Sequence, residues 1–165
     1  MDKSKKILIY GFGNPGREDD ALGHETATML GEWAMHHKFE NIDVETNYQL
    51  NVEDAEKISH YDVVIFVDAT QEDLHEFKFS HLEPSDKKVE FTMHAVSPSY
   101  LLYLSKDLFN KSPYACQMAI KGFSWEFKEG LTDNAKLNML QAFQYLTRRL
   151  EAFECTEIHR PISML

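Results

Sequence analysis

Three carboxylates stand directly after a glycine-rich turn near the start of the chain. The stretch Ile7–Gly23 reads ILIYGFGNPGREDDALG and carries Glu18, Asp19 and Asp20 where a helix is expected to begin. A helix N-terminus attracts anions because its backbone N–H groups are unpaired and its dipole end is positive. Here the chain supplies the anions itself. This turn should therefore repel a nucleotide phosphate and favour a cation, or hold a carboxylate ready for chemistry.

Two further candidates follow segments that are predicted to be strands. Asp68 comes directly after the apolar run VVIFV, and His94 follows a strand candidate that ends at Thr92. Sites in open α/β sheets form beyond the carboxyl ends of the strands, so we expect the fold to bring Asp20, Asp68 and His94 together. Two carboxylates and one imidazole suit a divalent cation of intermediate softness, such as nickel or zinc, and leave coordination positions open.

Each of these residues also has an explanation that involves no chemistry. Asp20 alone fits a helix-start carboxylate that complements the dipole. Asp68 is harder to explain in this way, because a carboxylate after a fully apolar strand lies near the functional edge of a sheet. His94 is one of eight histidines in the chain. The three residues together therefore carry more weight than any one of them alone.

The elements that would position these residues alternate between strands and helices. The hydrophobic patterns predict strands at Ile7–Tyr10, Ile42–Glu45, Val63–Val67, Phe77–Leu82 (an edge strand), Lys88–Thr92 and Tyr114–Gly122. They predict helices at Ala21–His37, Val52–Ser59, Pro98–Leu108 and Asn134–Phe153. This order is typical of an α/β fold: a three-layer sandwich with a twisted, mostly parallel sheet of about five strands and helices on both faces.

The helix starts carry capping residues. Asn51 is the expected N-cap of the second helix, Ser97 that of the third, and Thr132 or Asp133 that of the last. We expect residues 1–154 to form one domain, with residues 155–165 as a C-terminal tail, because Pro161 and the lack of a clear period mark that end.

Composition narrows the choice of partners and of compartment. The net charge of −10 disfavours nucleic acid, whose binding depends on neutralising phosphates. No apolar run approaches the ~20 residues of a membrane-spanning helix, so no membrane partner is expected. Cys116 and Cys155 lack CxxC spacing, which favours two free thiols in a reducing cytoplasm and no structural zinc. We expect a cytoplasmic protein.

These motifs resemble those of the hydrogenase maturation endopeptidases, which remove a C-terminal extension from the large subunit of [NiFe] hydrogenases after nickel insertion. The segment GFGNPGREDDALG is similar to the family's G-x-G-N turn and acidic pair, and VVIFVDAT is similar to its strand that ends in Asp-Ala. The segment FTMHAVSPSYLLYL corresponds to its histidine-bearing stretch. The resemblance runs over nearly the whole chain and includes Tyr48–Ile58 and Ile120–Ala135.

The resemblance implies a protease without a permanent catalytic metal. Asp20, Asp68 and His94 correspond to the family's three metal-contacting residues and are the implied catalytic site. They would probe the nickel that cysteines of the large-subunit precursor already hold, so that cleavage follows loading. Because an unperturbed histidine has a pKa of about 6.5, activity should fall on acidification below that range. We expect the protein to be a monomer that acts on this precursor.

Four further residues are candidates for substrate binding. Many family members have a D-G-G/T turn after the second strand, whereas this chain reads ETNYQL and presents Tyr48 and Gln49. Asn14 and Arg17 of the glycine-rich turn complete the set. The latter two also have structural explanations: Arg17 as an ion-pair partner of a neighbouring acid, and Asn14 as a turn residue that tolerates unusual backbone angles.

Three other functions remain open. A peptidyl-tRNA hydrolase begins with a similar G-x-G-N-P-G turn, but here REDDALGHE replaces that family's T-R-H-N stretch and the chain is acidic. A dinucleotide enzyme would use the GxGxxG spacing and Glu45 at the end of the second strand, although four charged residues follow Gly16. A nickel-binding chaperone that docks on the same precursor is the third, and the sequence separates it poorly from a protease.

Overall fold

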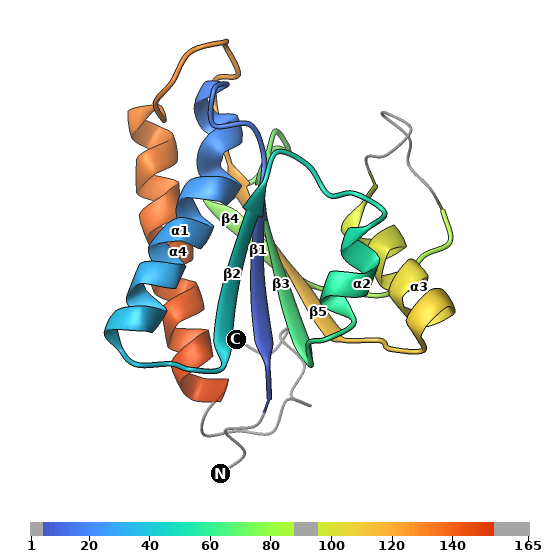
Figure 1. Ribbon diagram of the computed structural model, residues 1–165. Helices are drawn as coiled ribbons and strands as arrows, with labels where there is room; N and C mark the ends of the chain where they lie inside the picture. Colours follow the sequence, from blue (N-terminus) through green and yellow to red (C-terminus); the bar gives the residue numbers. More distant parts are fainter. Residues whose placement is uncertain (1–4, 88–95, 154–165) are drawn as a thin grey trace.

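A central sheet lies between two layers of helices in the computed structural model, which describes residues 5–87 and 96–153 (Figure 1). The strands are β1 (Ile7–Phe12), β2 (Ile42–Asn47), β3 (Val63–Thr70), β4 (Phe77–Leu82) and β5 (Tyr114–Lys121). Their order is β2-β1-β3-β5-β4, and only the edge strand β4 runs antiparallel to its neighbour. The predicted α/β architecture is confirmed, and so is the edge position of Phe77–Leu82. The predicted strand Lys88–Thr92 lies outside the described residues.

The helices cover the two faces of the sheet in pairs. The short 3-10 helix η1 (Glu18–Ala21) leads into α1 (Leu22–His36), which packs with α4 (Asp133–Phe153) on one face. The helices α2 (Asp54–Ile58) and α3 (Pro98–Phe109) cover the other. None of the helices in the described part of the chain combines the length and the hydrophobicity that a bilayer-spanning helix needs.

The sheet separates two hydrophobic clusters. Side chains that alternate along β1 and β3 point to opposite faces, so Ile9 joins α1 and α4 in one cluster while Leu8 joins α2 and α3 in the other. The apolar run Val63–Val67 is at most 1% exposed throughout, as its β-branched and aromatic sequence predicts for a strand covered on both faces. Cys116 is a free, buried thiol on β5.

Close backbone approach explains two of the glycines in the first motif. A Cβ at Gly11 would collide with the carbonyl oxygen of Gly23, and a Cβ at Gly23 would collide with the carbonyl oxygens of Phe12 and Val67. The start of α1 therefore lies directly against β1 and β3. This contact fixes where the acidic turn sits relative to the end of β3.

Two of the three helix-cap predictions are confirmed. The Ser97 hydroxyl accepts a hydrogen bond from the Tyr100 backbone N–H, and the Thr132 hydroxyl accepts one from Ala135. The prediction of Asn51 is wrong, because α2 begins later than expected, at Asp54, and has no side-chain cap. The contact is reversed: the Asp54 carboxylate accepts a hydrogen bond from the backbone N–H of Asn51 at 2.9 Å.

Candidate active site

The glycine-rich turn connects the end of β1 to η1 and folds tightly over that helix. Gly13 has φ of 140°, a conformation that side-chain-bearing residues rarely adopt, and a Cβ there would strike the carbonyl oxygen of Asp20. The backbone N–H of Gly13 donates to the carbonyl of Asn47 at 3.1 Å. The turn therefore holds together η1 and the segment that follows β2.

Asp20 is partly exposed and folds back onto this turn. Its Oδ2 accepts a hydrogen bond from the backbone N–H of Asn14 at 2.8 Å. Asn14 Oδ1 in turn accepts from the backbone N–H of Gly16 at 2.8 Å, which is the turn role predicted for Asn14, although its φ is not positive. Asp20 Oδ1 accepts no hydrogen bond from residues 5–87 and 96–153.

Asp68 lies close enough to Asp20 to respond to its charge. Burial raises the pKa of Asp68 to about 7, with a smaller contribution in the same direction from the Asp20 carboxylate, while a hydrogen bond from the Ala69 backbone N–H acts to lower it. Two carboxylates from distant parts of the sequence therefore lie close together. A divalent cation between them would stabilise the buried charge of Asp68 and offset the repulsion between the two carboxylates.

The strand that carries Asp68 is longer than predicted. It does not end at Val67: the parallel pairing with β5 continues through Asp68, which lies opposite Ala119, to Thr70, which lies opposite Lys121. The apolar sequence shows only where the side chains of β3 are buried on both faces of the sheet. The backbone hydrogen bonds between β3 and β5 continue beyond that point, because β5 lies alongside as far as Thr70. Asp68 is therefore held by a regular strand and not by a loop.

Asp19 has a structural role that the sequence did not reveal. Its carboxylate is fully buried and accepts hydrogen bonds from the backbone N–H groups of Phe123, Ser124 and Thr132, and from the Thr132 hydroxyl, at 2.7–3.1 Å. Both oxygens are therefore occupied by groups of the segment between β5 and α4. Asp19 anchors that segment and has no free oxygen for a cation.

Glu18 also binds the segment between β5 and α4. Its Oε1 accepts a hydrogen bond from the Ser124 hydroxyl at 2.7 Å, and its backbone N–H donates to the Lys128 carbonyl at 2.8 Å. Of the three acids that open the first helix, two are thus buried and fixed, and Asp20 alone is partly exposed. Spacing could not have distinguished them, because their partners lie more than one hundred residues further along the chain.

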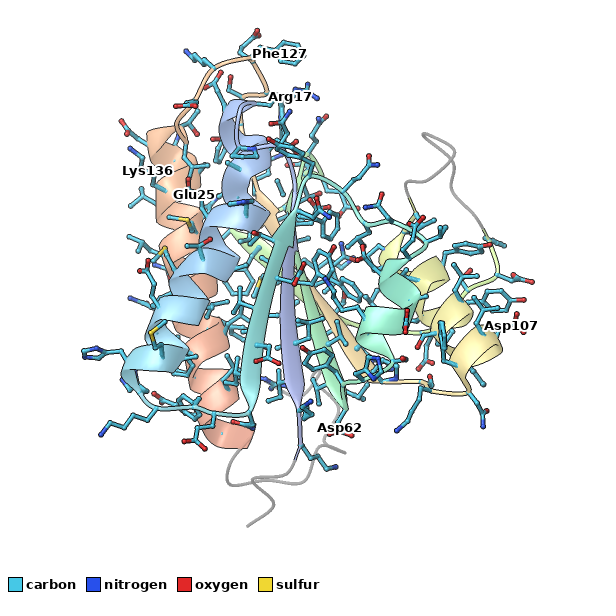
Figure 2. All side chains as sticks on the ribbon, viewed as in Figure 1. Arg17, Glu25, Asp62, Asp107, Phe127 and Lys136 are labelled. Atoms are coloured by element: carbon cyan, nitrogen blue, oxygen red, sulfur yellow. The ribbon has the colours of Figure 1, made fainter. Side chains whose placement is uncertain are left out.

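Arg17 does not form the ion pair with Glu18 or Asp19 that was one of its two explanations. Its Nε and Nη2 donate to the carbonyl oxygen of Trp125 at 3.3 and 3.2 Å, and its guanidinium lies 4.9 Å from the centre of the Phe127 ring. Figure 2 shows both side chains beyond the N-terminal ends of α1 and α4, at the end of the molecule where the parallel strands terminate.

The other two substrate-binding candidates lie on the segment after β2. Tyr48 is 68% exposed and Gln49 is exposed as well. Tyr48 is joined through its backbone N–H to the Asn47 side chain, and Asn47 accepts the hydrogen bond from the glycine-rich turn. Gln49 Nε2 donates a hydrogen bond to Asn51 Oδ1 at 3.2 Å. Both candidates therefore lie at the same end of the sheet as the glycine-rich turn, and Tyr48 is the more exposed of the two.

A buried polar pair, Tyr10 and Asp54, holds the segment that follows β2. The Tyr10 hydroxyl donates to the Asp54 carboxylate at 2.8 Å, and burial, followed by this carboxylate, raises the pKa of the tyrosine. Because Asp54 also accepts from the backbone of Asn51, the pair anchors the turn that follows Tyr48 and Gln49. A tyrosine in the middle of the apolar β1 sequence was the only available signal for it.

The third predicted metal ligand, His94, lies outside the described residues. Within residues 5–87 and 96–153, no cluster of three or more histidine, cysteine, aspartate or glutamate side chains could hold a metal ion. The described part of the site consists of the pair Asp20 and Asp68. The metal-binding roles of all three residues stay predictions.

No protein-family model and no curated protein matches the sequence. Solved structures do match. A [NiFe] hydrogenase maturation protease HycI from Thermococcus kodakarensis KOD1 has a TM-score of 0.70 at 21% identity, covering 91% of this chain and 96% of that one. The hydrogenase maturating endopeptidase HybD from E. coli has a TM-score of 0.68 at 16% identity, covering 88% and 92%.

A third structure agrees with these two. The endopeptidase HycI from Escherichia coli has a TM-score of 0.61 at 22% identity, covering 90% of this chain and 91% of that one. The similarity extends over nearly the full length of both chains in each case, so it concerns the whole fold and not one motif. The chain therefore has the fold of the [NiFe] hydrogenase maturation proteases.

Proposed function

We propose that this protein is an endopeptidase that removes a C-terminal extension from the nickel-loaded large-subunit precursor of a [NiFe] hydrogenase. Asp20, Asp68 and His94 recognise the nickel, which belongs to the substrate and not to the enzyme. Cleavage then depends on prior loading of the precursor. A permanent catalytic metal is not required.

One observation carries this proposal: Asp20 and Asp68 come from distant parts of the sequence, yet they lie close enough at the carboxyl end of β3 for the Asp20 carboxylate to help raise the pKa of Asp68. On the fold of the maturation proteases, this pair occurs where a site is expected. Carboxylates with a free oxygen can bind a divalent cation, which stabilises them in their charged form. Two routes to hydrolysis fit this arrangement: the carboxylates activate water, or the nickel polarises the scissile carbonyl.

The precursor's polypeptide would contact the surrounding turns. Asn14 and Arg17 on one side and Tyr48 and Gln49 on the other are the proposed substrate-binding residues. Two observations support this assignment. The hydrogen bond from Gly13 to Asn47 holds the two turns next to each other, and Tyr48 is exposed on the second of them.

The deciding experiment incubates the protein with the nickel-loaded precursor and determines the mass of the product. Wild-type protein should release a C-terminal peptide from loaded precursor and leave the metal-free precursor intact. Asp20→Asn, Asp68→Asn and His94→Ala should each reduce the rate by about 100-fold or more, because each removes a direct contact to the metal. Asp107→Asn on α3, an exposed aspartate far from this edge, is the matched control and should cleave normally (Figure 2).

A stable complex with intact, nickel-loaded precursor would instead identify the protein as a chaperone. Full cleavage by the Asp20 and Asp68 variants would disprove the assignment of the site. The dinucleotide alternative has less support, since Glu45, its proposed ribose-binding acid, forms an ion pair with Lys57 at 2.6 Å.

A further inference from the structure

The segment between β5 and α4 exposes two phenylalanines beside the proposed site. Phe127 is 84% exposed and Phe123 is 48% exposed. Phe127 belongs to neither hydrophobic cluster of the protein, so it contributes no core packing that would explain an apolar side chain there. Two large exposed apolar side chains on one short loop are what a surface covered by another molecule would present.

The backbone beneath these side chains is firmly held. Asp19 accepts hydrogen bonds from the backbone N–H groups of both Phe123 and Ser124, and its own backbone N–H donates to the Ser124 carbonyl at 3.1 Å. The Glu18 backbone is bonded to Lys128 in the same way. The phenylalanines are therefore presented on an ordered support, so a partner would meet them with little loss of backbone freedom.

A cation completes this surface. The Arg17 guanidinium uses two N–H groups on one carbonyl oxygen, that of Trp125, and stacks near the exposed ring of Phe127. Among the described residues, no carboxylate lies within ion-pair distance of it. Its remaining N–H groups have no hydrogen-bond partner in the described part of the chain, so they can bind an anion even though the net charge of the chain is −10.

The surface is directly linked to the proposed site. Arg17 lies three positions before Asp20, and Asp19 and Glu18 between them hold the loop that bears the phenylalanines. Whatever binds to Phe127 and Arg17 is therefore placed beside Asp20. We infer that Phe123, Phe127 and Arg17 form a docking surface for a segment of the precursor in which an apolar side chain stands next to a carboxylate.

This inference rests on the proposed function for the identity of the partner. The apolar side chain of the precursor packs on the Phe127 ring, and the neighbouring carboxylate binds Arg17. Aromatic and arginine side chains are the residues that most often dominate binding at interfaces. Lys128, whose side chain is 69% exposed, lies 4.0 Å from the Glu18 carboxylate and is paired with it. Glu126 and Glu129 are exposed acids on the same loop, so Arg17 supplies the positive charge of the docking surface.

The test measures binding of the metal-free large-subunit precursor, which is not cleaved, to immobilised wild-type protein and variants. Phe127→Ala should weaken binding about tenfold, and so should Arg17→Gln. Added salt should weaken binding of wild type more than that of Arg17→Gln, because the contact is charged. Met35→Ala, which removes a 78% exposed side chain at the far end of α1, and Arg148→Gln on α4 are the matched controls and should bind as wild type does.

Parallel cleavage of nickel-loaded precursor separates the two proposals. If wild type cleaves and Phe127→Ala binds and cleaves equally well, the docking surface is wrong while the function stands. If binding is lost in both variants but wild type never cleaves, the docking surface stands and the function is wrong. Self-association that Phe127→Ala abolishes, with precursor binding unchanged, would assign the surface to a second copy and overturn the inference. Because Phe127 lies outside both clusters, its replacement should leave the melting temperature unchanged.

Discussion

At the scale of single residues, the three consecutive acids Glu18, Asp19 and Asp20 have different roles although the sequence does not distinguish them. Asp19 and Glu18 are buried and bind the segment before α4. Asp20 lies near Asp68, and its Oδ1 accepts no hydrogen bond from the residues that the structure describes. A carboxylate that is buried next to another one destabilises the folded protein when it ionises. The cation of the proposed function would offset this destabilisation.

Replacing Asp68 by Asn should therefore stabilise the protein above neutral pH. The pKa of Asp68 is raised to about 7 in the folded protein from the ordinary aspartate value of 3.8, so between these two pH values the folded state binds a proton that the unfolded state has lost. The free energy of unfolding consequently falls as pH rises from about 4 to 7. Above pH 7 it stays lower by up to about 4 kcal/mol, because Asp68 is then ionised in the folded protein. Asp68→Asn removes this cost without changing the shape of the side chain.

Thermal melts of wild type and Asp68→Asn at several pH values would check this. The variant should melt higher at pH 8 and match wild type near pH 4. Equal melting temperatures at pH 8 would mean that Asp68 ionises as readily when folded as when unfolded. Asp107→Asn, an exposed aspartate on α3, should show no such pH dependence.

At the scale of elements, the segment between β5 and α4 owes its order to a side chain more than one hundred residues away. Asp19 provides acceptors for three backbone N–H groups and one hydroxyl of this segment. The sequence does contain the residues involved, but its periodicity describes only which faces of helices and strands are apolar. Contacts between a loop and a distant carboxylate leave no period, so neither the anchor nor the exposed position of Phe127 could be predicted.

Asp19→Ala should release this segment. The change leaves the backbone N–H groups of Phe123, Ser124 and Thr132 without acceptors, at a cost of about 3 kcal/mol or more in the free energy of unfolding. Amide hydrogen exchange should accelerate most at these three residues. Asp20→Asn serves as the control and should leave their protection intact; similar protection in both variants would show that Asp19 is not the anchor.

At the scale of the whole molecule, the alternation of apolar strands and amphipathic helices was enough to predict the layers. The uninterrupted run Val63–Val67 gave a central strand, and the weak alternation of Phe77–Leu82 gave an edge strand, because covered strands are apolar on both faces and edge strands are not. The rule that sites form at the carboxyl ends of parallel strands then placed Asp20 near Asp68. It could not show that β3 extends through Asp68, since backbone pairing continues beyond the apolar run.

The proposed site requires Asp20 and Asp68 to behave as one electrostatic pair. An NMR pH titration of the Asp68 carboxyl carbon, in wild type and in Asp20→Asn, tests this most directly. We predict a midpoint of about 7 in wild type and a lower one in the variant, because burial and the neighbouring charge both raise the pKa. A wild-type midpoint near the ordinary aspartate value of 3.8, or one that does not respond to the loss of Asp20, would show that the two carboxylates are not a pair.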